Sequence, residues 1–192
     1  MTQPVSQSGY LGGRLLIASP LIGDPRFDRA VVYMCSHDAE QAMGLIVNRP
    51  MEGLSLPDLL EQLEVADAEK AEPRPVLDGG PVDRDRGFVL HTAEIDYGPA
   101  SLMVAPGIAL TATREILDAL VSDTRPRRAM MALGYAGWDA GQLEDEIAAN
   151  AWLVCEPDEA LLFAQGGEEK WTRALALLGV TPEFLTAASG HA

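Results

Sequence analysis

Two of the three histidines stand beside residues that could take part in chemistry. His37 is followed by Asp38, and His91 closes an apolar run, whereas His191 lies next to the C-terminus. Two histidines and a carboxylate could serve a hydrolase as acid and base, or could bind a metal. The further carboxylates considered for a metal site are Asp24, Asp28 and Asp85. Because no pair has the spacing of a compact motif such as H-E-x-x-H, we expect no metal and no cofactor.

A cysteine also stands close to a histidine. Cys35 and His37 are two residues apart, so on a strand both side chains face the same side. A reactive thiolate pair is one interpretation, and a core cysteine below a surface histidine is the other. We favour core thiols for Cys35 and Cys155, because buried free cysteine is common.

A glycine–aromatic segment separates two apolar runs. Residues 134–138 (G-Y-A-G-W) follow the run 130–133, and a second apolar run occupies 152–155. This pattern predicts a strand, an elbow at 134–138, a helix capped by Asp139, and another strand.

The helix that is expected after the elbow carries a polar row. At 100° per residue, Gln142, Glu146 and Asn150 lie along the edge of its buried face. The row either pins the adjacent loop or lines a cleft that has Trp138 as one wall.

The other walls of that cleft are expected from two turns, N-R-P at 48–50 and G-G-P at 79–81. The glycine turn could expose N–H groups to an anion, but a tight turn with positive φ explains it equally well. The candidate ligand- or partner-binding residues are therefore Asn48, Arg49, Gly79, Gly80, Pro81, His91, Trp138, Gln142 and Glu146.

The elements that must position these residues do not alternate strictly. Strands are expected at 14–19, 30–36, 44–48, 75–77, 87–91 and 101–105, and helices dominate the C-terminal third. Ser55 and Asp58 predict a capping box at the start of a helix. The polar stretch 67–74 predicts a mobile surface loop. Consecutive strands followed by helices predict an α+β fold with a mixed or antiparallel sheet.

Length and composition bound the class of protein. The chain has 192 residues, of which 47% are hydrophobic and 22% are charged, which is typical of one globular domain. We expect a flexible tail at 1–9 and a single domain at 10–189. No apolar run approaches the roughly 18 residues that span a bilayer. The N-terminus has no export signal, so we expect a cytoplasmic protein with reduced cysteines.

The charge argues against two classes of partner. The chain has 14 Lys and Arg residues against 29 Asp and Glu residues, a net charge of −15. An acidic surface repels phosphates, so we expect neither direct nucleic-acid binding nor binding to anionic membranes.

Four ordered blocks carry a family resemblance. They occupy residues 27–50, 78–82 (D-G-G-P-V), 87–91 (G-F-V-L-H) and 133–147 (L-G-Y-A-G-W-D-A-G-Q-L-E-D-E-I). In this order and spacing they resemble the YqgE/AlgH family of bacterial proteins over about residues 12–178. The resemblance implies an α+β fold whose bifurcated sheet includes a small closed barrel surrounded by helices. It also implies a label as a transcriptional regulator connected with alginate production, but no established reaction, cofactor or catalytic residue.

Three functions remain open at this point. The first is a non-enzymatic regulatory or binding protein that acts through protein or small-ligand contacts and not through DNA. The alternative is a hydrolase-like enzyme that uses His37, Asp38 and His91 around a cleft. A third is an architectural role in subunit assembly, with Phe184 and Leu185 as an interface.

Overall fold

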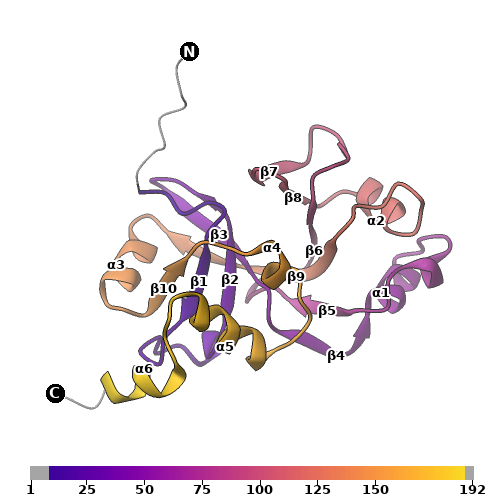
Figure 1. Cartoon of the computed structure of the whole chain (residues 1–192). Helices are drawn as coiled ribbons and strands as arrows, with labels where there is room; N and C mark the ends of the chain where they lie inside the picture. The colour runs from indigo at the N-terminus through magenta and orange to yellow at the C-terminus, as the bar shows by residue number, and fades with distance from the viewer. Residues whose placement is uncertain (1–8, 189–192) are drawn as a thin grey trace.

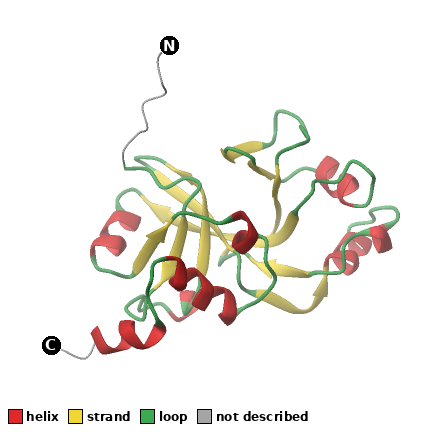
Figure 2. Cartoon of the chain, viewed as in Figure 1, coloured by secondary structure: helices red, strands yellow, loops and turns green. Residues whose placement is uncertain are grey.

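The computed structural model describes residues 9–188, in which helices surround a central sheet (Figures 1 and 2). The strands are β1 (Leu15–Ala18), β2 (Val31–His37), β3 (Gln41–Ile46), β4 (Pro50–Ser55), β5 (Pro75–Asp78), β6 (Val82–Thr92), β7 (Leu102–Ala105), β8 (Ile108–Thr111), β9 (Ala129–Asp139) and β10 (Trp152–Cys155). The helices are α1 (Leu56–Gln62), α2 (Arg114–Leu120), α3 (Gln142–Ala148), α4 (Glu159–Leu162), α5 (Glu168–Leu177) and α6 (Pro182–Ala188), with 3-10 turns η1 (Pro25–Phe27) and η2 (Ala68–Lys70). The predicted α+β class is confirmed.

Strand β9 joins the two parts of the sheet. The strand order is β10-β1-β2-β3-β9-β6-β8-β7, with β4 and β5 off this path. One edge of β9 pairs with β6, and the other pairs with β5 at Ala132 and Leu133 and with β3 from Ala136 onwards. The sheet therefore forks where β9 exchanges β5 for β3. The β5–β9 pair is parallel and the remaining pairs are antiparallel, so the sheet is mixed.

The sheet curls but does not close. Its strand path ends at β10 on one side and at β7 on the other, and these two strands do not pair with each other. Figure 1 shows β7 and β8 standing away from β1 and β10. The expectation of a small closed barrel is therefore wrong, because closure requires hydrogen bonds between the two end strands.

The predicted elbow at 134–138 is also wrong, because these residues continue β9. Ala136 and Trp138 are buried while Gly137 and Asp139 are exposed, which is the alternation of a strand. Gly134 has φ +75°, and the ladder with β6 shifts its register opposite this glycine, between Val82, which pairs with Tyr135, and Gly87, which pairs with Leu133. The glycine therefore bends a strand and does not end it.

The helix after β9 begins two residues later than the sequence predicts. Gly141 occupies the N-cap of α3 with φ +75°, and Asp139 remains the last residue of β9. The side chain of Gln142 accepts the Asp139 N–H at 3.1 Å, so the turn between strand and helix is closed by a glutamine.

The sequence pattern missed two strands, β4 and β8. Pro50 suggested that the chain stops there, but β4 pairs with β5 alone. A strand that has one partner tolerates proline, because the missing N–H is not needed on the open edge.

The capping box of α1 is confirmed. The Ser55 hydroxyl accepts the Asp58 N–H, and the Asp58 carboxylate accepts the Ser55 N–H at 3.1 Å. The following polar stretch at 67–74 is not the open loop that its composition suggests. It contains η2, and Ala68 and Ala71 are buried in a cluster with the leucines of α1.

Three apolar clusters stabilise these elements by removing apolar surface from water. One packs α5 on one face of β1 and β2. A second lies on their other face and surrounds Trp138 and Trp152 near α3. The third packs α1 and α2 on β6 and β9. In Figure 1, α1 and α2 lie at one end of the molecule, and α3, α5 and α6 lie around β1, β2 and β10.

The predicted tail at 1–9 lies outside the described residues except for Gly9, as does residue 189. None of the helices within 9–188 is long and apolar enough to cross a membrane.

Candidate functional site

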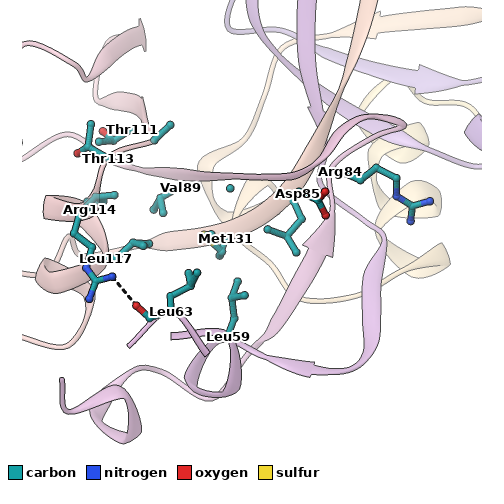
Figure 3. A pocket seen from close by; sticks show the side chains of 14 residues that line it. Leu59, Leu63, Arg84, Asp85, Val89, Thr111, Thr113, Arg114, Leu117 and Met131 are labelled. Carbon is teal, nitrogen blue, oxygen red and sulfur yellow. Dashed lines mark hydrogen bonds between the residues drawn. The ribbon is translucent and has the colours of Figure 1, made fainter. Parts of the chain in front are cut away.

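A pocket of about 400 Å³ lies between α1, α2 and the strands β6 and β9 (Figure 3). We call it the α1–α2 pocket. Its volume falls within the range of sites for small molecules. The residues that form its apolar floor are Leu59, Val89, Ile116, Leu117, Met131 and Leu133.

The floor follows from strand and helix periodicity. Val89 pairs with Met131, and Gly87 pairs with Leu133, across β6 and β9. Residues directly opposite each other in a ladder, and those two positions along, share one face of the sheet. Helix α2 covers this face with Ile116 and α1 covers it with Leu59, both of which are buried.

Gly87 gives Met131 room in the floor. A Cβ atom at position 87 would lie 2.5 Å from the terminal methyl of Met131. The absence of a side chain at Gly87 therefore fixes where the Met131 side chain lies at the centre of the pocket (Figure 3).

Charged and polar side chains form the rim. Arg114 donates to the carbonyls of Leu63 at 2.6 Å and Glu64 at 2.8 Å, which ties the start of α2 to the end of α1 (the Leu63 bond is the dashed line in Figure 3). Arg84 lies on the opposite side and pairs with Asp78 at 3.2 Å. Both guanidinium groups are exposed. The Asp85 carboxylate also lines the pocket, so the rim carries two guanidinium groups and one carboxylate (Figure 3).

A buried hydrogen-bond chain supports the rim at Thr111. His91 Nδ1 donates to the Thr92 carbonyl at 3.0 Å, because a carbonyl can only accept, and this leaves Nε2 to accept from Thr111 at 2.8 Å. The Thr111 hydroxyl in turn contacts Ser101 at 2.7 Å. Burial lowers the pKa of His91, while the bond to Thr92 opposes that shift. The neutral imidazole thus holds β6, β8 and the start of β7 together.

The family follows from comparison with known proteins. Residues 15–183 match the family described as AlgH-like. The chain belongs to the AlgH-like family. This confirms the resemblance that the four sequence blocks carry.

Curated relatives of this AlgH-like chain match it over nearly their whole length. A UPF0301 protein from Caulobacter vibrioides is 54% identical over 184 residues, which cover 95% of this chain and 94% of the relative. A UPF0301 protein from Bradyrhizobium diazoefficiens is 48% identical over 196 residues, covering 98% of this chain and 92% of the relative.

Solved structures agree with the AlgH-like fold. The solution structure of the AlgH protein from Pseudomonas aeruginosa has a TM-score of 0.77 and 42% identity, with both chains covered completely. A crystal structure of a protein from Corynebacterium diphtheriae has a TM-score of 0.70 over 86% of this chain and 85% of its own. At 18% identity, the second likeness shows the fold alone.

In this AlgH-like chain the two histidines of the hydrolase hypothesis do not share a site. His37 lies beside Ala42, which pairs with Trp138, whereas His91 pairs with Ala129. Trp138 and Ala129 are nine residues apart in β9, which corresponds to roughly 25–30 Å along the strand.

His37 and Asp38, the neighbouring pair of the hydrolase hypothesis, already bind other groups within the fold. His37 accepts the Leu11 N–H through Nδ1 and contacts Glu144 at 2.9 Å through Nε2. The Asp38 carboxylate accepts two N–H groups of its own turn. Within residues 9–188, no three His, Cys, Asp or Glu side chains gather as a metal site would require.

Cys35 is a core thiol. It is buried beside Tyr33, whose carbonyl accepts from Sγ at 3.6 Å, and burial raises the pKa of Cys35 to about 12. A thiolate pair with His37 therefore does not form.

The polar row of α3 pins its neighbours. Glu146 Oε2 accepts from the indole N–H of Trp138 at 2.9 Å and of Trp152 at 2.7 Å, and Glu146 Oε1 accepts from Gln142 at 2.9 Å. At the end of the row, the backbone carbonyl of Asn150 accepts a hydrogen bond from the Ser19 hydroxyl. Trp138 is buried and, with Gly137 and Asp139, lines part of an open cavity of about 580 Å³.

The candidate residues of the two turns are also engaged within the fold. Asn48 accepts the Val31 N–H at 2.8 Å and donates to the carbonyls of Arg29 and Gly167. The Arg49 guanidinium donates to the Asp28 carbonyl at 3.0 Å.

The glycines at 79 and 80 permit a backbone crossing. A Cβ atom at Gly79 would lie 2.3 Å from the Gly134 carbonyl oxygen, and one at Gly80 would lie 2.1 Å from the carbonyl carbon of Tyr135. The G-G-P turn thus passes directly over β9. This close approach, and not an anion, explains the two glycines.

The nine sequence-predicted candidates therefore do not converge on one cavity, and none of them lines the α1–α2 pocket. Partner binding through them stays a prediction. The G-F-V-L-H block carries a signal for the pocket, because Gly87 and Val89 face the pocket while Phe88 and Leu90 face the opposite core.

Proposed function

We propose that this AlgH-like protein is a non-enzymatic binding protein whose α1–α2 pocket holds the apolar body of a small anionic ligand. The single observation that supports this most is a pocket of about 400 Å³ with an apolar floor and a rim that carries two arginines against one carboxylate, that of Asp85. In a chain of net charge −15, such a rim favours anions locally.

The rim arginines remain available to a ligand. Arg114 uses its two terminal nitrogens on backbone carbonyls, and its Nε forms an exposed ion pair with Asp118 at 3.5 Å. One N–H on each terminal nitrogen is left for a ligand. The ion pair of Arg84 with Asp78 is exposed, and exposed pairs contribute little, so an incoming carboxylate can compete with it.

A cytoplasmic location is part of the proposal. Cys35 and Cys155 are both buried and unpaired, which fits a reducing compartment. A regulatory role would then depend on whether the pocket is occupied.

The proposal is tested with 8-anilinonaphthalene-1-sulfonate, which combines apolar rings with one anionic group. Its fluorescence should rise with one saturable site per chain, and octanoate should compete with it. Leu117→Trp places a bulky indole on the pocket floor and should weaken binding at least tenfold. Leu102→Trp, which places the same bulk on the exposed strand β7, should leave binding unchanged. Equal binding by all three proteins would refute the proposal.

The same proposal excludes recognition of DNA bases. A surface with 29 acidic residues against 14 basic ones should give no gel shift with duplex DNA at physiological salt. Tight and sequence-selective binding under those conditions would overturn this part of the proposal.

A further inference from the structure

A second pocket, of about 430 Å³, has the opposite chemistry and shares no lining residue with the α1–α2 pocket. It lies between the segment 70–74, which leads into β5, and the segment 125–129, which leads into β9. We call it the basic pocket.

The sign of its charge contrasts with that of the chain. Four of the chain's 14 lysines and arginines line the basic pocket, namely Lys70, Arg74, Arg125 and Arg127, against one carboxylate, that of Glu72. The chain as a whole carries −15. A concentration of cations in a concave site of an acidic protein selects small anions that can enter it, while the surrounding surface repels long polyanions.

Two of these cations, Arg74 and Arg125, differ in how they are held. Arg74 is largely buried and donates to the carbonyls of Ala129 at 2.7 Å and Phe163 at 2.9 Å, so its guanidinium is fixed in place. Arg125 is exposed and, among the described residues, has neither an ion pair nor a hydrogen bond. The arrangement therefore combines one rigid cation with one uncommitted cation.

The other two cations are held only by exposed pairs. Arg127 contacts Glu159 at 2.8 Å, and Lys70 contacts Asp67 at 3.2 Å. Because exposed ion pairs are weak, a doubly charged anion can displace these carboxylates.

Apolar side chains complete the walls. Leu56 and Leu120 come from the ends of α1 and α2, and Pro73 and Pro126 flank the two loops. Arginine forks match the oxygen geometry of phosphate, and the apolar walls offer a surface for the remainder of a ligand. We propose that the basic pocket binds a small phosphate-bearing molecule.

The test is an NMR titration of ¹⁵N-labelled protein with sodium pyrophosphate at constant ionic strength of 0.15 M. Saturable shifts should be confined to amides of residues 70–74 and 125–129. Arg125→Gln should weaken binding about tenfold, the loss expected for one charge-assisted hydrogen bond. Arg86→Gln is the matched control, because Arg86 is also exposed and forms no ion pair within residues 9–188, but lies over Phe88 in another part of the molecule.

Further arms separate the sources of the phosphate. Adenosine monophosphate binding more tightly than pyrophosphate would assign the apolar walls to the organic part of the ligand, and the reverse order would assign the site to free polyphosphate. Both orders support the proposal. Citrate binding as tightly as pyrophosphate, shifts that do not saturate, or equal weakening by Arg86→Gln would overturn it.

Discussion

At the scale of single residues, Glu146 shows how far sequence reasoning reaches. Helical geometry predicts that Gln142 and Glu146 share an edge of α3, and the structure places them in contact at 2.9 Å. The sequence could not reveal that Glu146 also accepts a hydrogen bond from the Trp152 indole, because that contact depends on the pairing of β10 with β1. Position along a helix is a local property, whereas the partner is set by tertiary structure.

Glu146→Ala should lower the free energy of unfolding by about 2–4 kcal/mol, because two buried indole N–H groups lose their acceptor. Glu146→Gln should cost less, since its amide oxygen still accepts. Asp145→Ala, on the exposed side of the same helix, should change stability by no more than about 0.5 kcal/mol. Urea unfolding measures all three, and a wild-type value for Glu146→Ala would show that the carboxylate has no structural role.

His91 should make stability depend on pH. Burial holds the pKa of His91 below its ordinary value of 6.5, so the unfolded chain binds a proton that the folded chain does not. Its contribution is therefore fully present above pH 6.5 and is lost as pH falls through 6.5 toward the folded pKa, with a slope of at most about 1.4 kcal/mol per pH unit.

The measurement is urea unfolding of the wild type and His91→Gln at several values between pH 7.5 and 5.5. The wild type should lose more stability over this range than the variant does. Parallel curves for the two proteins would mean that His91 is not the responsible group.

At the scale of elements, sequence patterns predict a feature correctly when the interacting residues are close in the chain, and they fail when the partner is distant. The Ser55–Asp58 capping box is correct because both partners lie within one turn. The elbow at 134–138 is wrong because Gly134 permits a close crossing with the turn at Gly80, which is more than fifty residues earlier in the chain. A glycine required by a distant backbone looks in sequence like a glycine required by a local turn.

The crossing predicts a large difference between two glycines that both have positive φ. Gly80→Ala would place a Cβ atom 2.1 Å from the Tyr135 carbonyl carbon, so it should cost more than about 3 kcal/mol or prevent folding. Gly107→Ala, at φ +81° with no atom within 4 Å of the added Cβ, should cost about 1 kcal/mol. Thermal unfolding followed by circular dichroism compares them, and equal losses would contradict the crossing.

At the scale of the whole molecule, composition and block order predicted the class and the family. They did not predict the pockets, because each cavity is lined by segments that are far apart in the chain. The net charge of −15 describes the chain as a whole, and it does not indicate that four basic residues gather in one pocket. The open edges at β7 and β10 likewise follow from strand pairing, which the order of elements alone does not determine.

Binding of a small molecule with an apolar body and an anionic head in the α1–α2 pocket can be tested directly. The most direct measurement is a titration of methyl-labelled protein with octanoate, followed by NMR. Octanoate should cause saturable shifts of the Met131, Leu117 and Leu59 methyls with one dissociation constant, and Leu117→Trp should raise that constant at least tenfold at Met131 and Leu59. Shifts that fail to saturate, or that are as large at the exposed Leu102 and Met103, would contradict it.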